Sequence, residues 1–257
     1  GLVGSEMCIR DRYEFKNKGI NVYLEALNRL TRDKNLKKDV LAFINVPGWV
    51  GEVREDLRER LDSGKDYDTP LECPFITHWL HNMSHDQVLD MLKYLNMSNS
   101  VDTKVKVVFV PCYLDGKDGI LNELYYDLLI GTDLSVYPSY YEPWGYTPLE
   151  SIAFKVPTIT TDLAGFGLWV NSLTGKNATL QDGVKVIHRT DYNYSEVADT
   201  IKDTISEFSS LTSTEINKIR KNAANIAEKA LWKHFIQYYY EAYDIALRNA
   251  AKRLSLN

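Results

Sequence analysis

One short segment constrains the fold of this chain more than any other: Ser139-Tyr-Tyr-Glu-Pro-Trp-Gly-Tyr-Thr-Pro-Leu-Glu150. It follows a strand-like run at residues 133–138 and leads into a helix-like run at residues 149–155. The junction is therefore predicted to be a strand, a tight turn and a helix, which is where α/β folds place their ligands. Two carboxylates, Glu142 and Glu150, flank this turn.

The start of the helix after this turn can be predicted residue by residue. Thr147 suits the N-cap, Pro148 suits the first helical position, and Glu150 stands where a capping box needs its acid. The N–H groups of such a first turn favour an anion, for example a phosphate. Gly145 would let the backbone approach a ligand closely.

These residues also have a purely structural interpretation, which the sequence leaves open. Glu150 could do no more than close the capping box, and Glu142 could be an exposed carboxylate in a turn. The same turn is crowded with rings, which is typical either of a packed core or of a wall against a sugar or a base. These rings belong to Tyr140, Tyr141, Trp144 and Tyr146.

The rest of the chain alternates β-branched runs with helical stripes. We expect strands at residues 40–46, 105–110, 133–138, 157–161 and 184–188. We expect helices at residues 18–32, 52–61, 85–95, 121–131, 194–209, 214–229 and 232–251. Such alternation predicts an α/β fold in which a parallel sheet carries helices on both faces.

Composition narrows the class of protein. The chain has 257 residues and a net charge of −5, which argues against a nucleic-acid partner because such a partner favours a basic face. It has no apolar run long enough for a membrane helix, so we expect no membrane partner. The cysteines Cys8, Cys73 and Cys112 form neither a disulfide framework nor a zinc pattern, which favours a reducing cytoplasm.

The segment described first resembles the signature of the animal and fungal glycogen synthases, glycosyltransferase family 3. That family continues to a Gly-Phe-Gly turn, which this chain matches in Thr161-Asp-Leu-Ala-Gly-Phe-Gly167. A second block agrees, in Arg12-Tyr-Glu-Phe-Lys-Asn-Lys-Gly19 followed by Val22-Tyr-Leu-Glu-Ala-Leu27. The resemblance runs from Arg12 to about Leu247, and it carries two long motifs in the family's order.

The resemblance implies the GT-B fold, in which two Rossmann-like domains face each other across a cleft. Residues 12–257 would be its C-terminal, nucleotide-sugar-binding domain, with a helical insertion around residues 47–103 and with the N-terminal domain absent. Residues 1–11 look like a non-native lead, and the strand that the family has before the Arg-Tyr-Glu-Phe block is missing or replaced.

The resemblance also implies roles for individual residues. Arg12 and Lys18 would bind the phosphates of a sugar donor, and Glu142 would be the catalytic carboxylate beside the donor sugar. Glu150, counted with Glu142 among the catalytic residues, would hold the ribose hydroxyls, and Tyr125 would stack on the base. The remaining donor-binding residues would be Trp144, Gly145, Tyr146 and Thr147.

We expect no metal and no cofactor. The spacing of His78, His81 and His85 resembles a metal cluster on one helix face, but no cysteine or carboxylate completes it at a recognised spacing. The similar family also transfers glucose without a metal.

The chain departs from the family in a late helix, which in animal and fungal members carries arginines that sense glucose 6-phosphate. Arg220 remains, but Asn222 and Asn225 stand where arginines are expected. Fewer guanidinium groups weaken phosphate capture. The departure therefore predicts that glucose 6-phosphate does not control this protein, and it favours a bacterial origin.

The resemblance as a whole implies a retaining glucosyltransferase that extends glycogen or another α-1,4-glucan, with UDP-glucose as first and ADP-glucose as second choice of donor. This chain alone is expected to be inactive. The alternatives are another retaining GT-B sugar transferase, a nucleotide-sugar epimerase, or a non-catalytic glycogen-associated module. The sequence leaves open whether the protein forms a homo-oligomer.

Overall fold

The core of the molecule is a six-stranded parallel sheet with the strand order β5-β2-β1-β6-β7-β8. The computed structural model describes residues 4–10 and 13–254. The strands are β1 (Gly4–Arg10), β2 (Asp39–Asn45), β5 (Val105–Val110), β6 (Leu134–Val136), β7 (Thr158–Thr161) and β8 (Val184–Ile187). The predicted parallel sheet is thus confirmed.

β1 lies inside the segment that we interpreted as a lead. It pairs with β2 along its whole length, from Gly4 opposite Asp39 to Arg10 opposite Asn45, and it also pairs with β6. The position before the Tyr13-Glu-Phe block is therefore filled by a strand. That residues 1–11 are a non-native lead stays a prediction.

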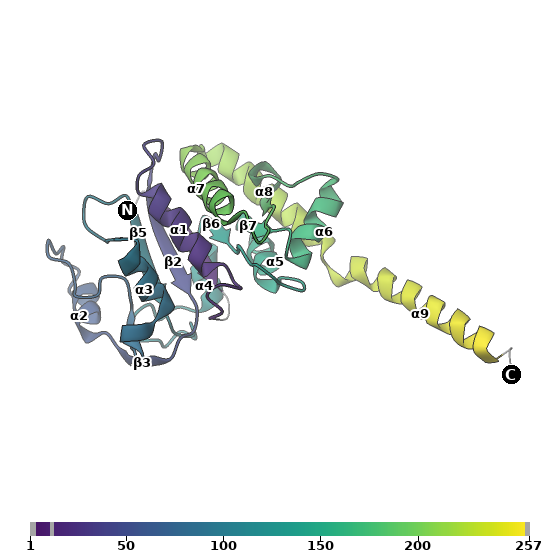
Figure 1. Ribbon diagram of the computed structural model, residues 1–257, viewed down its shortest axis with the longest axis horizontal. Coiled ribbons are helices and arrows are strands. Elements are labelled where there is room, and N and C mark those ends of the chain that lie inside the picture. The colour runs from purple at the N-terminus through teal and green to yellow at the C-terminus, as the bar shows by residue number, and fades with distance from the viewer. Residues whose placement is uncertain (1–3, 11–12, 255–257) are drawn as a thin grey trace.

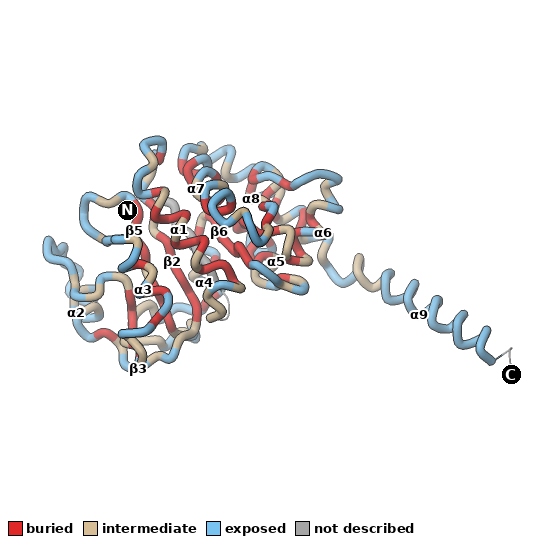
Figure 2. Tube along the Cα trace, viewed as in Figure 1, coloured by how far each residue is buried: buried red, intermediate tan, exposed pale blue. Residues whose placement is uncertain are grey.

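Helices cover both faces of the sheet because its parallel strands need right-handed crossovers. On one face, α1 (Ile20–Leu30), α3 (Gln87–Tyr94) and α7 (Tyr194–Ser210) share one apolar core with β2, β5 and β6. Near the other end of the sheet, α5 (Tyr146–Ala153), α6 (Gly165–Thr174) and α8 (Ser213–Lys229) form a second core with β8. Figure 2 shows the buried residues along the strands and the inward sides of these helices.

The apolar stripe of α1 is the local pattern that fixes its orientation. Ile20, Tyr23, Leu24, Leu27 and Leu30 recur at helical spacing, and all five are fully buried. The helix predicted for residues 18–32 is therefore confirmed in type and position. Its first residue follows directly on the turn that carries Lys18.

The segment between β2 and β5 contains more than helices. Besides α2 (Glu55–Ser63), the short helix η1 (Met83–His85) and α3, it holds an antiparallel pair of strands, β3 (Val50–Val53) and β4 (His78–Leu80). The helix predicted from residue 52 was wrong at its start, because residues 50–53 pair with β4 and the helix begins only at Glu55. The assignment of residues 47–103 as a family insertion stays a prediction.

Another helix also begins later than predicted. α4 runs over Tyr125–Gly131 rather than from residue 121. The carboxylate of Asp118 accepts hydrogen bonds from the backbone N–H groups of Ile120, Leu121 and Asn122, so these residues form a turn around it. A local side-chain bond of this kind competes with helix formation.

The last helix, α9 (Trp232–Leu254), projects from the body of the molecule (Figure 1). It has no buried residue in this structure, and aromatic side chains such as Tyr240 and Tyr243 are more than half exposed. Among the described residues, none of the helices has both the length and the apolar character needed to cross a membrane.

Arg54 ties together the segment between β2 and β5, and its side chain is fully buried. Its guanidinium donates to the carbonyl oxygens of Glu72 and Cys73, at 2.6 and 2.5 Å. It also pairs with Asp56 at 2.5 Å and lies 4.5 Å from the centroid of the Trp79 ring. Removing such a donor leaves buried carbonyl groups without a partner, which is costly.

We therefore expect Arg54→Met to lower the free energy of unfolding by about 3 kcal/mol. The matched control is Arg58→Met on α2, where an exposed arginine pairs with Glu55, and it should cost less than about 0.5 kcal/mol. Urea unfolding of the two variants measures the difference. Equal losses would contradict the role given to Arg54.

Candidate functional site

The candidate site lies where the strand order of the sheet reverses. From β1 the chain continues to β2 and β5 on one side of the sheet. From the neighbouring strand β6 it continues to β7 and β8 on the other side. Open α/β sheets bind ligands outside the carboxyl ends of the strands at such a reversal, which makes this edge of the sheet the candidate site. Lys18 comes from the turn after β1, and Glu142 comes from the turn after β6.

These two side chains form an ion pair, Lys18 Nζ to Glu142 Oε2. Lys18 is 3% exposed, and the side chain of Glu142 is 19% exposed. A buried ammonium group is stable only beside a counter-charge, so the carboxylate stabilises the lysine in its charged form. The structure thus brings together the predicted phosphate-binding cation and the predicted catalytic carboxylate.

The turn that carries Glu142 is held by backbone hydrogen bonds to the start of α6. Glu142 accepts from the N–H of Gly165 at 3.0 Å, and Trp144 accepts from the N–H of Phe166 at 2.7 Å. A Cβ atom at Gly165 would overlap the carbonyl oxygen of Pro143, so only glycine allows this approach. The Gly-Phe-Gly turn therefore supports the signature segment, a role that the sequence alone did not indicate.

The predicted capping box at the start of α5 is wrong. The helix begins at Tyr146, its N-cap is Gly145 with φ 112°, and no side chain caps it. Thr147 and Glu150 consequently lie inside the helix rather than at its cap, both partly exposed. The positive φ of Gly145 starts the helix two residues early, as glycine alone does readily. The first turn presents backbone N–H groups rather than a capped end.

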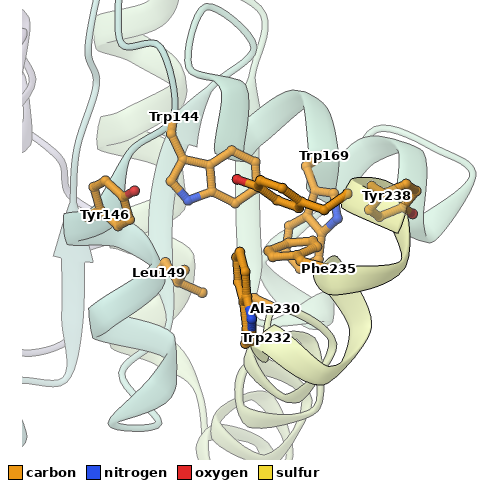
Figure 3. A pocket seen from close by; sticks show the side chains of 9 residues that line it. Trp144, Tyr146, Leu149, Trp169, Ala230, Trp232, Phe235 and Tyr238 are labelled. Carbon is orange, nitrogen blue, oxygen red and sulfur yellow. The ribbon is translucent and has the colours of Figure 1, made fainter. Parts of the chain in front are cut away.

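The aromatic residues of the signature segment fall into two groups. Tyr140 and Tyr141 are exposed, whereas Trp144 packs against Phe166, Trp169 and Phe235, with ring centroids 5.7–6.2 Å apart across this cluster. Figure 3 shows that Trp144, Trp169 and Phe235 of this cluster line one pocket together with side chains of α5 and α9. The pocket has a volume of about 470 Å³. It is lined by Trp144, Tyr146, Leu149, Trp169, Ala230, Trp232, Phe235, Tyr238 and Tyr239.

This pocket does not include the ion pair, so Trp144 and Tyr146 line a different surface from Lys18 and Glu142. Tyr125 lies apart as well. It is 6% exposed and packs with Leu129 and Val156 at the start of α4. Its assignment as the residue that stacks on a base stays a prediction. Arg12 lies outside the described residues.

Three residues at the carboxyl ends of β7 and β8 were missed by the sequence reasoning. Asp162 accepts hydrogen bonds from the Arg189 backbone N–H at 2.9 Å and from His188 Nδ1 at 2.6 Å. The Arg189 side chain is 5% exposed, and burial lowers its pKa to about 10. Both predicted strands end beside these residues, so extending the carboxyl-edge argument to them would have found the cluster.

The three histidines do not share a helix face. His78 lies on β4, and His85 ends η1. The ligand atoms of His78, Cys112 and Asp118 do lie within 4.8 Å of one another. Both nitrogens of His78 already have partners, however, Thr77 Oγ1 at 2.9 Å and the Asp118 carbonyl at 2.7 Å. Burial, with the charge of Asp118, raises the pKa of Cys112 to about 12, so this thiol stays protonated.

The late helix α8 turns its remaining family arginine inward. Arg220 pairs with Asp133 at 3.0 Å and donates to the carbonyl oxygen of Thr132 at 3.2 Å. Asn222 donates to the carbonyl of Gln181 at 2.8 Å. These contacts fasten α8 to the residues just before β6 and to the short helix that contains Gln181. The absence of control by glucose 6-phosphate stays a prediction, and an inward Arg220 supports it.

Comparison with solved structures supports the fold assignment. The chain is similar to the N-terminal domain of a trehalose-6-phosphate phosphatase from Candida albicans, with 14% identity, a TM-score of 0.52, and coverage of 93% of this chain and 41% of that one. It is likewise similar to an E. coli structure titled "Trehalose-6-phosphate … bound with UDP-2-fluoro glucose", with 11% identity, a TM-score of 0.52 and coverage of 93% and 44%. The fold is that of the C-terminal domain of a GT-B glycosyltransferase.

Comparison of sequences then defines the family. The profile described as glycogen synthase matches residues 57–254. Glycogen [starch] synthase isoform 1 of Saccharomyces cerevisiae is 26% identical over 94% of this chain, and the liver glycogen [starch] synthase of Homo sapiens is 24% identical over 95%. The chain belongs to the glycogen synthase family. It spans 42% of the yeast relative and 41% of the human one.

The pair of His188 and Asp162 has a measurable consequence. The hydrogen bond and the charge of Asp162 raise the pKa of His188 above its usual 6.5, because they favour the protonated ring. The stability that this pair contributes is therefore fully present below pH 6.5 and is lost as the pH rises through the raised pKa. An NMR titration should show the raised value in the wild type and a value near 6.5 in Asp162→Asn. A wild-type His188 that titrates at or below 6.5 would contradict the pair.

Proposed function

We propose that this chain is the donor-binding part of a retaining glucosyltransferase that extends glycogen or another α-1,4-glucan with glucose from UDP-glucose. The observation that carries the proposal is the Lys18–Glu142 pair at the edge of the sheet where the strand order reverses. Membership of the glycogen synthase family supports it, and so does a similar structure whose title names a bound UDP sugar. ADP-glucose is the second choice of donor, and the proposed compartment is the cytoplasm.

Lys18 would bind the diphosphate of the donor. Transfer leaves negative charge on the departing diphosphate, and a buried cation stabilises such charge more strongly than an exposed one. The backbone N–H groups at the start of α5, which have no side-chain cap, would share this task. Arg12 is proposed as a further phosphate ligand from the family motif.

Glu142 would act on the sugar. When the diphosphate of the donor binds Lys18, the Glu142 carboxylate loses its counter-charge. It can then accept hydrogen bonds from the sugar hydroxyls and stabilise the positive charge that develops at the anomeric carbon. Its carbonyl and N–H are fixed to the start of α6 and to Leu163, so its position is set before the donor binds. Glu150 would hold the ribose hydroxyls, and Tyr125, Trp144, Gly145, Tyr146 and Thr147 are proposed as further donor contacts.

The first test is nucleotide binding by this chain. We expect calorimetry to show weak binding of UDP and UDP-glucose, and weaker binding of ADP and ADP-glucose. Transfer to a malto-oligosaccharide should not occur, because the chain spans well under half of its relatives and such enzymes depend on closure of a cleft. Robust transfer by the chain would contradict this expectation, and no affinity for any nucleotide sugar would overturn the proposed function.

The second test is Glu142→Gln in a transferase-active protein that contains this chain. The change should lower the turnover number by more than tenfold, about 1.4 kcal/mol in the activation barrier, while the affinity for UDP stays near that of the wild type. The reason is that the carboxylate acts on the sugar in the transition state rather than on the nucleotide. Glu207→Gln, at an exposed position on α7, is the control and should leave both quantities unchanged. A Glu142→Gln variant with a tenth or more of wild-type turnover would reduce Glu142 to a turn residue.

A further inference from the structure

The turn that carries Lys18 and the turn that carries Glu142 touch each other through their backbones. The N–H of Tyr140, in the signature segment, donates to the carbonyl of Asn17 at 2.6 Å. Gly19, at φ 72°, places its α carbon against the carbonyl oxygen of Pro138, where a Cβ atom would overlap that oxygen. The relative position of the two turns therefore depends on what surrounds the Pro138 carbonyl.

Arg189 occupies that place. Its Nη1 donates a hydrogen bond to the carbonyl oxygen of Pro138. The same nitrogen lies 2.9 Å from the position that a Cβ atom of Gly19 would take, so it contacts the Lys18 turn as well. The guanidinium also lies over the ring of Tyr140, 5.4 Å from its centroid. A single buried side chain thus contacts both turns at their junction.

The backbone of Arg189 is itself held in place. Its N–H donates to Asp162 Oδ1, and the other carboxylate oxygen accepts from His188. Asp162 follows β7, and Arg189 follows β8, so the side chain projects from the anchored ends of two strands. Although burial lowers its pKa to about 10, the guanidinium keeps its charge at neutral pH.

We propose that Arg189 is a positioning residue for donor binding: it locks the turn of Lys18 against the turn of Glu142, so that the ammonium group and the carboxylate lie next to each other at the carboxyl edge of the sheet. This inference rests on the proposed function, since it assigns Lys18 and Glu142 to the donor. Arg189 is not assigned to the donor itself, because its Nη1 donates to the Pro138 carbonyl and its guanidinium lies over the Tyr140 ring. A planar, permanently charged guanidinium suits this task better than a flexible ammonium group.

The test compares two variants with a matched control. Arg189→Met removes the hydrogen bond, and Arg189→Lys keeps the charge without the planar group. The control is Arg220→Met, because Arg220 is an arginine that likewise donates to a carbonyl next to β6, but it is 24% exposed and lies at the opposite end of that strand. Calorimetry with UDP should show at least tenfold weaker binding for Arg189→Met, a loss of about three- to tenfold for Arg189→Lys, and a change within twofold for Arg220→Met. A folded Arg189→Met with UDP affinity within twofold of the wild type would overturn the proposal.

A double-variant cycle distinguishes positioning from general destabilisation. If Arg189 acts through the Lys18 turn, Arg189→Met should have little further effect on UDP affinity once Lys18→Met is present. Losses that simply multiply would show that Arg189 acts independently of Lys18, which also overturns the proposal.

Hydrogen exchange gives a readout that needs no nucleotide. The amide of Tyr140 and the peptides covering residues 13–20 should exchange faster in Arg189→Met and Arg189→Lys than in the wild type, but not in Arg220→Met. Unchanged exchange rates in both Arg189 variants would contradict the proposal that Arg189 holds the two turns together. If the wild type binds no UDP, the proposed function fails while the exchange data still decide whether Arg189 holds the two turns together. If Arg189→Met does not fold, the lysine variant decides both measurements.

Discussion

The buried charge pair of Lys18 and Glu142 is the interaction on which the candidate site depends. A lysine with 3% of its side chain exposed needs a counter-charge close by, and its partner comes from 124 residues further along the chain. The two residues meet because β1 and β6 are neighbours in the sheet although they are far apart in sequence. Without a ligand, the charges of Lys18 and Glu142 neutralise each other. An anion that binds Lys18 therefore changes the electrostatic environment of the Glu142 carboxylate.

Close contact between backbones is what allows this pair to form. Gly19 lies against the carbonyl of Pro138, and Gly165 lies against the carbonyl of Pro143, at distances that no side chain would allow. Through these two contacts, residues 138–143 pack against two neighbouring loops, one after β1 and one after β7. The glycines of the two family motifs therefore serve the packing of the loops on one another as well as any approach to a ligand.

The signature segment serves two parts of the molecule at the same time. Its carboxylate faces the loop after β1, whereas Trp144 packs against α6 and the first turns of α9. The aromatic pocket in Figure 3 thus joins the segment to the helix that projects from the body.

Local pattern in the sequence was sufficient for the fold class and for most elements. The apolar stripe of α1 and the β-branched runs of β2 and β5 predicted their positions closely, because burial of a repeating apolar face decides such elements. It failed where a partner distant in sequence decides the outcome. The strand β3 exists because β4 pairs with it, and α5 starts at Tyr146 because Gly145 adopts a positive φ beside Phe166 in the first turn of α6.

The family motifs in the sequence predicted that Lys18, Glu142 and Gly145 belong to one candidate site. Their arrangement in space followed only from the fold: Lys18 is buried against Glu142, Trp144 lines a separate pocket, and Arg189 lies between the two turns. The physical reason is that a motif gives the residue types and their order along the chain, but not the contacts that these residues make. Burial, pairing of charges and backbone contact depend on which loops the strand order brings together at one edge of the sheet.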